Sequence, residues 1–84
     1  MDNLLCFTAV EFVNDPKVKG WTYWYLCTFD GAEEGDKVIA PLGRHDNIQT
    51  GLIRKVSYTT AEEAPYPADR IKKIVSLIKA DKYV

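Results

Sequence analysis

The stretch GDKVIAPLGR, residues 35–44, places a turn, a short strand and a second turn within ten residues. Gly35 and Asp36 suit a tight turn, because glycine accepts positive φ and aspartate bonds to its own backbone. The β-branched residues that follow favour a strand. Pro41 has no N–H for a central ladder, so this strand should end there or lie at a sheet edge, and Gly43 lets the chain turn again. Such a stretch is typical of a small β-barrel.

Length and composition predict one globular domain over residues 1–84, since 46% of the residues are hydrophobic and 27% are charged. No apolar run approaches the roughly 20 residues of a membrane span. The first residues lack the basic region of a signal peptide, so we expect a cytoplasmic protein with no membrane contact. The formal net charge of -1 argues against tight, nonspecific nucleic-acid binding. Any contact with nucleic acid should therefore be local.

Two strands should flank the turn stretch at a distance. Residues 4–13 are apolar on both faces, as in a strand that is covered on both sides or curled into a barrel. Residues 52–58 predict a later strand in which Arg54 and Lys55 face water. Residues 59–65 are polar and predict a connection across the surface.

Residues 21–29, WTYWYLCTF, are the most strand-like run of the chain. Tyr23 and Tyr25 share one face with three other residues, and Trp24 lies on the opposite face. Both faces cannot be equally buried in so small a protein. We therefore expect one face to leave an aromatic side chain near solvent.

Cys6 and Cys27 are the two cysteines, and each lies inside a strand-like run rather than at the spacing of a metal site. We interpret them as reduced thiols of the core, and we expect neither a metal nor a cofactor. If their strands are neighbours, a disulfide is geometrically feasible, although a reducing compartment disfavours it.

A C-terminal amphipathic helix is predicted over about residues 67–80. Pro67 suits the first turn of a helix, and apolar residues follow at the spacing i, i+3, i+4, i+7, namely Ile71, Ile74, Val75 and Ile78. Basic residues make this end locally positive: Arg70, Lys72, Lys73, Lys79 and Lys82. The predicted fold is therefore mainly β, a small four-to-five-stranded antiparallel barrel of the SH3 or OB kind, with one helix across an open end or side.

The order of motifs also carries a resemblance. The motifs are YWYL at 23–26, GDKVIAPLG at 35–43, Arg44, GLI at 51–53, and PYP at 65–67 leading to Lys72. Their order and spacing over about residues 5–76 resemble the N-terminal domain of the primosomal replication-restart helicase (primosomal protein N′), which caps the 3′ end of DNA. In that family the corresponding motifs are Phe-Asp-Tyr-Leu, Gly-x-x-Val-x-Val-Pro-Phe-Gly, a basic loop, a glycine-led apolar strand and a short connection into a helix.

The resemblance implies a pocket for a terminal nucleotide. It carries the family's aromatic positions over to Tyr23 and Tyr25, its turn glycine to Gly43 and its helix lysine to Lys72. The family's aspartate, which is suited to accept a hydrogen bond from the terminal 3′-hydroxyl, is replaced by Trp24. An indole cannot accept that bond. It can stack on a base, which contributes about 1–3 kcal/mol per base.

The loop after the turn stretch, RHDN at 44–47, holds the single histidine of the chain. The sequence offers no Ser/His/Asp set, paired-carboxylate motif, metal spacing or phosphate loop of a helicase motor, so we expect no enzyme. We interpret the loop as a solvated hairpin. Within it, Arg44 is the residue best suited to contact phosphate.

Two functions stay open from the sequence. One is a non-enzymatic module that contacts single-stranded DNA or a DNA end, through Tyr23, Trp24, Tyr25, Gly43, Arg44 and Lys72. The other is a protein-interaction module, which would use the exposed aromatic and the acidic turn to bind a replication factor or, in a phage or mobile element, a host nucleoprotein or nuclease. Net acidity favours the second and the resemblance favours the first. The sequence leaves the oligomeric state open.

Overall fold

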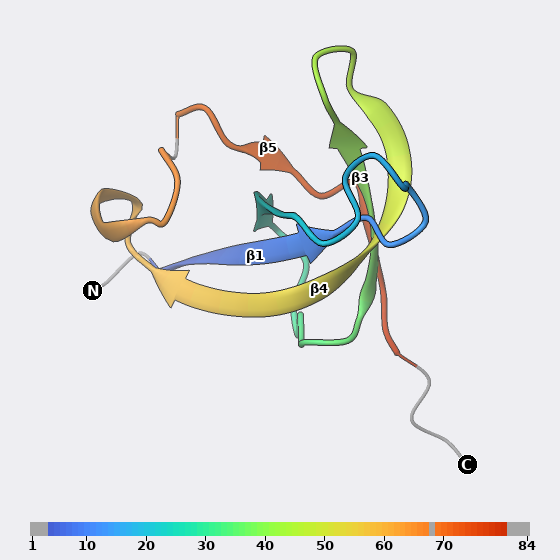
Figure 1. The fold of residues 1–84 in the computed structure, drawn as a ribbon. Coiled ribbons are helices and arrows are strands. Elements are labelled where there is room, and N and C mark those ends of the chain that lie inside the picture. Colours follow the sequence, from blue (N-terminus) through green and yellow to red (C-terminus); the bar gives the residue numbers. More distant parts are fainter. Residues whose placement is uncertain (1–3, 68, 81–84) are drawn as a thin grey trace.

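Six strands build a single sheet in the computed structural model, which describes residues 4–67 and 69–80. In chain order, the elements are β1 (Leu5–Glu11), β2 (Thr22–Cys27), β3 (Lys37–Leu42), β4 (Asn47–Thr59), a short 3-10 turn η1 (Ala61–Glu63), β5 (Lys72–Lys73) and β6 (Ser76–Ile78). The order across the sheet is β5-β2-β1-β4-β3-β6. The sheet is curled into a half-barrel, with β4 curving beneath β1 (Figure 1). The predicted mainly β class is confirmed.

Strand β1 lies in the middle of the sheet, between β2 and β4, and is antiparallel to both. This position explains why residues 4–13 are apolar on both faces. In the β1–β2 pair Cys6 lies directly opposite Cys27, and both thiols are free. Burial raises the pKa of the Cys6 thiol, which favours its protonated form.

Strand β4 begins at Asn47, earlier than the sequence predicted, and it pairs with β3 along the whole length of β3. Its register with β1 shifts where Ala9 pairs with Lys55 and the next residue of β1 pairs with Ile53. Arg54 is the residue skipped by this shift, and its guanidinium binds the Glu11 carboxylate at 2.9 Å. The bulge explains why two consecutive basic side chains of β4 are exposed.

The predicted helix over residues 67–80 is wrong: the described part of this segment forms the two outermost strands of the sheet. β5 runs parallel to β2 on one side, and β6 runs antiparallel to β3 on the other. Between them, the N–H of Ile74 donates to the Leu26 carbonyl at 3.0 Å, and the N–H of Val75 donates to the Ile39 carbonyl at 2.7 Å. The residues described here include no helix long and apolar enough to cross a membrane.

The apolar residues of this segment are not buried as one stripe, as the predicted helix would require. Ile74 is buried in the core, whereas Val75 and Ile78 are about half exposed. All three are β-branched and favour extended backbone. The exposed backbone groups of β2 and β3 offer them hydrogen-bond partners, so edge pairing replaces the internal bonds of a helix. Lys82, which was part of the predicted positive end, lies outside the described residues.

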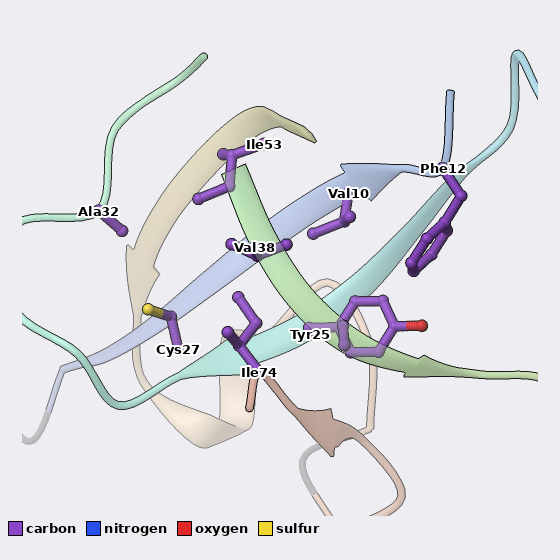
Figure 2. Packing of buried hydrophobic residues seen from close by; sticks show 9 residues of the cluster. Val10, Phe12, Tyr25, Cys27, Ala32, Val38, Ile53 and Ile74 are labelled. Atoms are coloured by element: carbon purple, nitrogen blue, oxygen red, sulfur yellow. The ribbon is translucent and has the colours of Figure 1, made fainter. Parts of the chain in front are cut away.

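The core lies on the concave side of the curled sheet and draws on every strand except β6 and the two-residue β5. Its buried apolar side chains are Val10, Phe12, Tyr25, Cys27, Ala32, Val38, Ala40, Ile53 and Ile74. Figure 2 shows Ile74 among side chains from β2 and β3, which explains how the last strands are anchored. The ring of Phe12 meets that of Tyr25 edge-on, with centroids 6.0 Å apart and an interplanar angle of 75°.

Candidate functional site

A hollow of about 420 Å³ opens along β2, between that strand, the β3–β4 hairpin and the chain leading into β5. We call it the aromatic hollow. Its lining residues are Val18, Thr22, Tyr23, Trp24, Tyr25, Leu42, Gly43, Tyr66, Arg70 and Lys72. This volume falls within the range of about 300–1,000 Å³ that is usual for small-ligand clefts.

Five of the six residues singled out from the sequence line this one hollow: Tyr23, Trp24, Tyr25, Gly43 and Lys72. They come from β2, from the β3–β4 turn and from β5, so the fold brings together segments that are far apart in the chain. Arg44 is the exception. It is exposed in the turn next to Gly43 and does not line the aromatic hollow.

The sheet edge explains how residues from both faces of β2 reach the same space. Within the described chain, β5 pairs with β2 only at Tyr25 and Leu26. The first half of β2 therefore has no neighbouring strand on that side, and the hollow lies there. Trp24 is half-buried there, and its side chain alternates in direction with those of Tyr23 and Tyr25. The exposed aromatic side chains of residues 21–29 are instead Trp21 and Phe29, which flank β2 and are 68% and 41% exposed.

Tyr25 forms a fixed wall of the aromatic hollow rather than a mobile contact. Its side chain is 3% exposed, and its hydroxyl donates to the Pro41 carbonyl at 2.6 Å. Burial, together with the nearby Tyr23 and Asp46, raises its pKa to about 12. The phenol is therefore neutral at physiological pH, and it fastens β2 to β3 across the floor of the hollow. Tyr23 is less buried and packs against Phe12, with ring centroids 6.1 Å apart.

Gly43 supplies backbone rather than a side chain. Its φ of 81° lies in the left-handed region, which explains the glycine at this turn. Its carbonyl accepts two hydrogen bonds, from the N–H of Asp46 at 3.2 Å and from the Lys72 ammonium at 2.6 Å. The lysine expected on a helix thus begins strand β5 and is held against the turn.

Ion pairs with carboxylates neutralise part of the positive charge of the C-terminal segment. Lys72 contacts the Asp46 carboxylate at 2.5 Å. Lys79 contacts the carboxylates of Asp36 and Glu33. Arg70 lines the hollow and, among the described residues, takes part in none of the observed ion pairs.

Sequence reasoning missed part of the lining, namely Val18, Thr22, Leu42, Tyr66 and Arg70. Tyr66 is 43% exposed and stands between two prolines. An aromatic residue held between two rigid residues was a signal that could have indicated it. Arg70 was counted in the basic segment but was not assigned to a site.

The aromatic hollow combines the side chains of three tyrosines and one tryptophan with two cationic side chains, Arg70 and Lys72. Within residues 4–67 and 69–80, no group of three or more His, Cys, Asp or Glu side chains is arranged to hold a metal ion. Comparisons with protein-family models, curated proteins and solved structures gave no match.

Proposed function

We propose that the chain is a non-enzymatic binding module whose aromatic hollow receives a base of single-stranded DNA or of a DNA end. The observation that carries this proposal is the convergence of Tyr23, Trp24, Gly43 and Lys72 on one hollow. Stacking on aromatic side chains is the usual way in which proteins hold an unpaired base, because every base has a π-face.

The exposed surface of the aromatic hollow suits this ligand class. Trp24 and Tyr23 are half-buried, and Tyr66 is 43% exposed, so aromatic groups remain accessible from solvent. Arg70 at the rim can contact a phosphate next to a stacked base. With a formal net charge of -1, the remainder of the protein adds little electrostatic attraction. The expected binding is therefore local, with few phosphate contacts.

The alternative is a protein-interaction module that uses the acidic turn. Asp36 of that turn is fully buried and is bound by Lys79, which also contacts Glu33. Asp36 therefore acts inside the protein, which reduces the acidic surface left for a partner to the exposed side chains of Asp30, Glu33 and Glu34. The protein-interaction module becomes the better explanation if the experiment below finds no binding.

The test is fluorescence anisotropy of a 5′-fluorescein-labelled oligothymidylate, measured at low and at moderate salt. The protein has two tryptophans, and the Trp21 side chain is 68% exposed and outside the hollow lining. We expect Trp24→Ala to weaken binding by about 1–3 kcal/mol, which is a loss of fivefold or more. Trp21→Ala is the matched control and should bind like the parent protein.

Two outcomes decide the proposal. Equal loss in both tryptophan variants, or no binding of the oligonucleotide at low salt, would contradict a base-binding hollow. A circular oligothymidylate of equal length then separates the two forms of the ligand. Binding to the circle indicates single-stranded DNA, whereas binding to the linear oligonucleotide alone indicates a DNA end.

A further inference from the structure

Lys72, the first residue of β5, already has hydrogen-bond and ion-pair partners within the protein. The ammonium of Lys72 lies 2.5 Å from Asp46 Oδ1 and donates to the Gly43 carbonyl at 2.6 Å. The Asp46 side chain is 62% exposed, so the pair is accessible from solvent. A phosphate that approaches Lys72 must therefore compete with a carboxylate of the same charge sign.

The turn that carries Asp46 has an unusual backbone. Asp46 has a φ of 52°, the one positive φ at a non-glycine residue in the described chain, and its N–H bonds back to Gly43. Aspartate and asparagine tolerate this left-handed conformation better than other non-glycine residues. The turn conformation and the ion pair with Lys72 thus depend on the same residue. Replacing Asp46 by asparagine removes the negative charge and keeps a residue that suits the turn.

The two cationic side chains of the aromatic hollow differ in availability. Lys72 has a carboxylate partner, whereas Arg70 forms no ion pair with any described residue. Arg70 is also exposed, so its guanidinium can reach an anion without breaking an existing contact. Lys72 and Arg70 therefore differ in whether their charge is already paired, although the sequence alone gives no reason to distinguish them.

We infer that Asp46 is a specificity-determining residue: it occupies Lys72 and excludes phosphate from it, so that a nucleotide binds by its base and by one phosphate contact at Arg70. This inference rests on the proposed function. The Asp46 carboxylate competes with phosphate for the Lys72 ammonium and repels phosphate at that end of the aromatic hollow. The site consequently selects a base with little dependence on backbone charge.

The experiment measures affinity for the labelled oligothymidylate as a function of salt in four proteins: the parent, Asp46→Asn, Lys72→Ala and the double variant. Releasing Lys72 by Asp46→Asn should tighten binding about three- to fivefold, the scale of one exposed ion pair. The slope of log affinity against log salt should steepen by about 0.7, which corresponds to one added phosphate contact on a single strand. If the gain depends on Lys72, the double variant should bind with the same affinity as Lys72→Ala.

Two further variants complete the design. Arg70→Ala should flatten the salt slope by about 0.7, because it removes the phosphate contact. Glu34→Gln is the charge control: it removes one negative charge from an exposed residue before β3, whereas Asp46 follows that strand. Its affinity should equal that of the parent.

The inference is overturned if Asp46→Asn binds no more tightly than the parent, if Glu34→Gln gives the same gain, or if the gain persists without Lys72. The proposed function survives any of these results as long as the parent binds and Trp24→Ala binds at least about fivefold more weakly. If neither the parent nor Asp46→Asn binds the oligothymidylate at low salt, both proposals fall together.

Discussion

The ammonium group of Lys79 lies 2.6 Å from Oδ2 of Asp36, whose side chain is fully buried in the turn before β3. The same carboxylate accepts hydrogen bonds from the backbone N–H groups of Glu33 and Ala80, each at 2.9 Å. Lys79 also contacts the Glu33 carboxylate at 3.2 Å and donates to the Gly31 carbonyl. One buried carboxylate thus fastens the chain after β6 to the turn between β2 and β3.

Replacing Asp36 by alanine should lower the free energy of unfolding by about 3 kcal/mol, because it leaves two partly buried N–H groups without their acceptor and removes the buried partner of Lys79. Urea unfolding followed by circular dichroism measures this loss. Lys79→Met should cost less, since the carboxylate keeps both backbone donors. A larger loss from Lys79→Met than from Asp36→Ala would contradict the assignment of Asp36 as the centre of this contact.

The stabilisation from Asp36 should depend on acid pH. Burial acts to raise the pKa of this carboxyl, but hydrogen bonds from Lys79, Ala80 and Glu33 outweigh it and hold the pKa below the ordinary value of 3.8. The unfolded chain therefore takes up the proton first as the pH falls. The stabilisation is complete well above pH 3.8, declines below that value and is lost once the pH passes the folded pKa. Urea midpoints of the parent and Asp36→Ala should converge at low pH, and a constant difference contradicts this prediction.

Gly51 lies in β4 beside the end of β1, opposite Val38 of β3. A Cβ at this position meets Val10 Cγ1 at 2.4 Å and the Glu11 carbonyl oxygen at 3.2 Å. Val10 is fully buried and has no free space into which it can move without shifting the core. We therefore expect Gly51→Ala to destabilise the protein by about 2 kcal/mol. The exposed neighbour Thr50→Ala is the control in the same unfolding assay, and an equal loss in both would show that the clash is unimportant.

Ile74 and Val75 test the strand structure of the C-terminal segment, because a helical stripe would bury both. Ile74→Ala should cost about 2–4 kcal/mol, whereas Val75→Ala, at a position 54% exposed, should cost less than about 1 kcal/mol. Amide hydrogen exchange adds an independent measurement. Both amides should be protected, since each donates to a neighbouring strand. Similar losses for the two substitutions would support the helix instead.

Tyr25 should ionise well above the ordinary pKa of a tyrosine, which is 10.0. Burial, with contributions from Tyr23 and Asp46, raises its pKa from 10.0 to about 12. Because the folded pKa is the higher one, stability is unaffected below pH 10 and declines as the pH rises toward 12. Ultraviolet titration should lose its latest-ionising phenol in Tyr25→Phe, which should also unfold about 1 kcal/mol more easily through loss of the bond to Pro41. An unchanged titration curve contradicts this assignment.

The β structure was predictable where the signal is local. Alternation over residues 21–29 and the turn chemistry of residues 35–44 both act between near neighbours, and β2 and β3 lie within them. Pro41 was expected where the strand ends or lies at a sheet edge. β6 pairs with β3 only from Lys37 to Ile39, so Pro41 lies on the part of β3 that β6 leaves uncovered. The start of β4 was missed because residues 47–50 are mostly polar and gain their strand conformation from the hairpin partner β3.

The C-terminal segment and the charges of the site were not predictable for a different reason. The spacing of the apolar residues fits a helix, but two open sheet edges decide the outcome, and a one-dimensional pattern contains no information about them. The aromatic hollow followed from a resemblance in the order of motifs, which indicated Tyr23 and Gly43. The Lys72–Asp46 ion pair depends on the three-dimensional approach of β5 to the hairpin, and no motif indicates it.

The positions of β5 and β6 give the molecule one vulnerable point. These two strands follow one another in the chain, yet they cover the flanks of β2 and β3 at opposite ends of the sheet order. A single proteolytic nick between Lys73 and Ser76 would therefore separate β6 from the rest of the chain, while β5 stays joined to the residues before it. Loss of β6 would expose the backbone groups of β3 at that end of the sheet, and an exposed strand edge of this kind pairs readily with a second molecule.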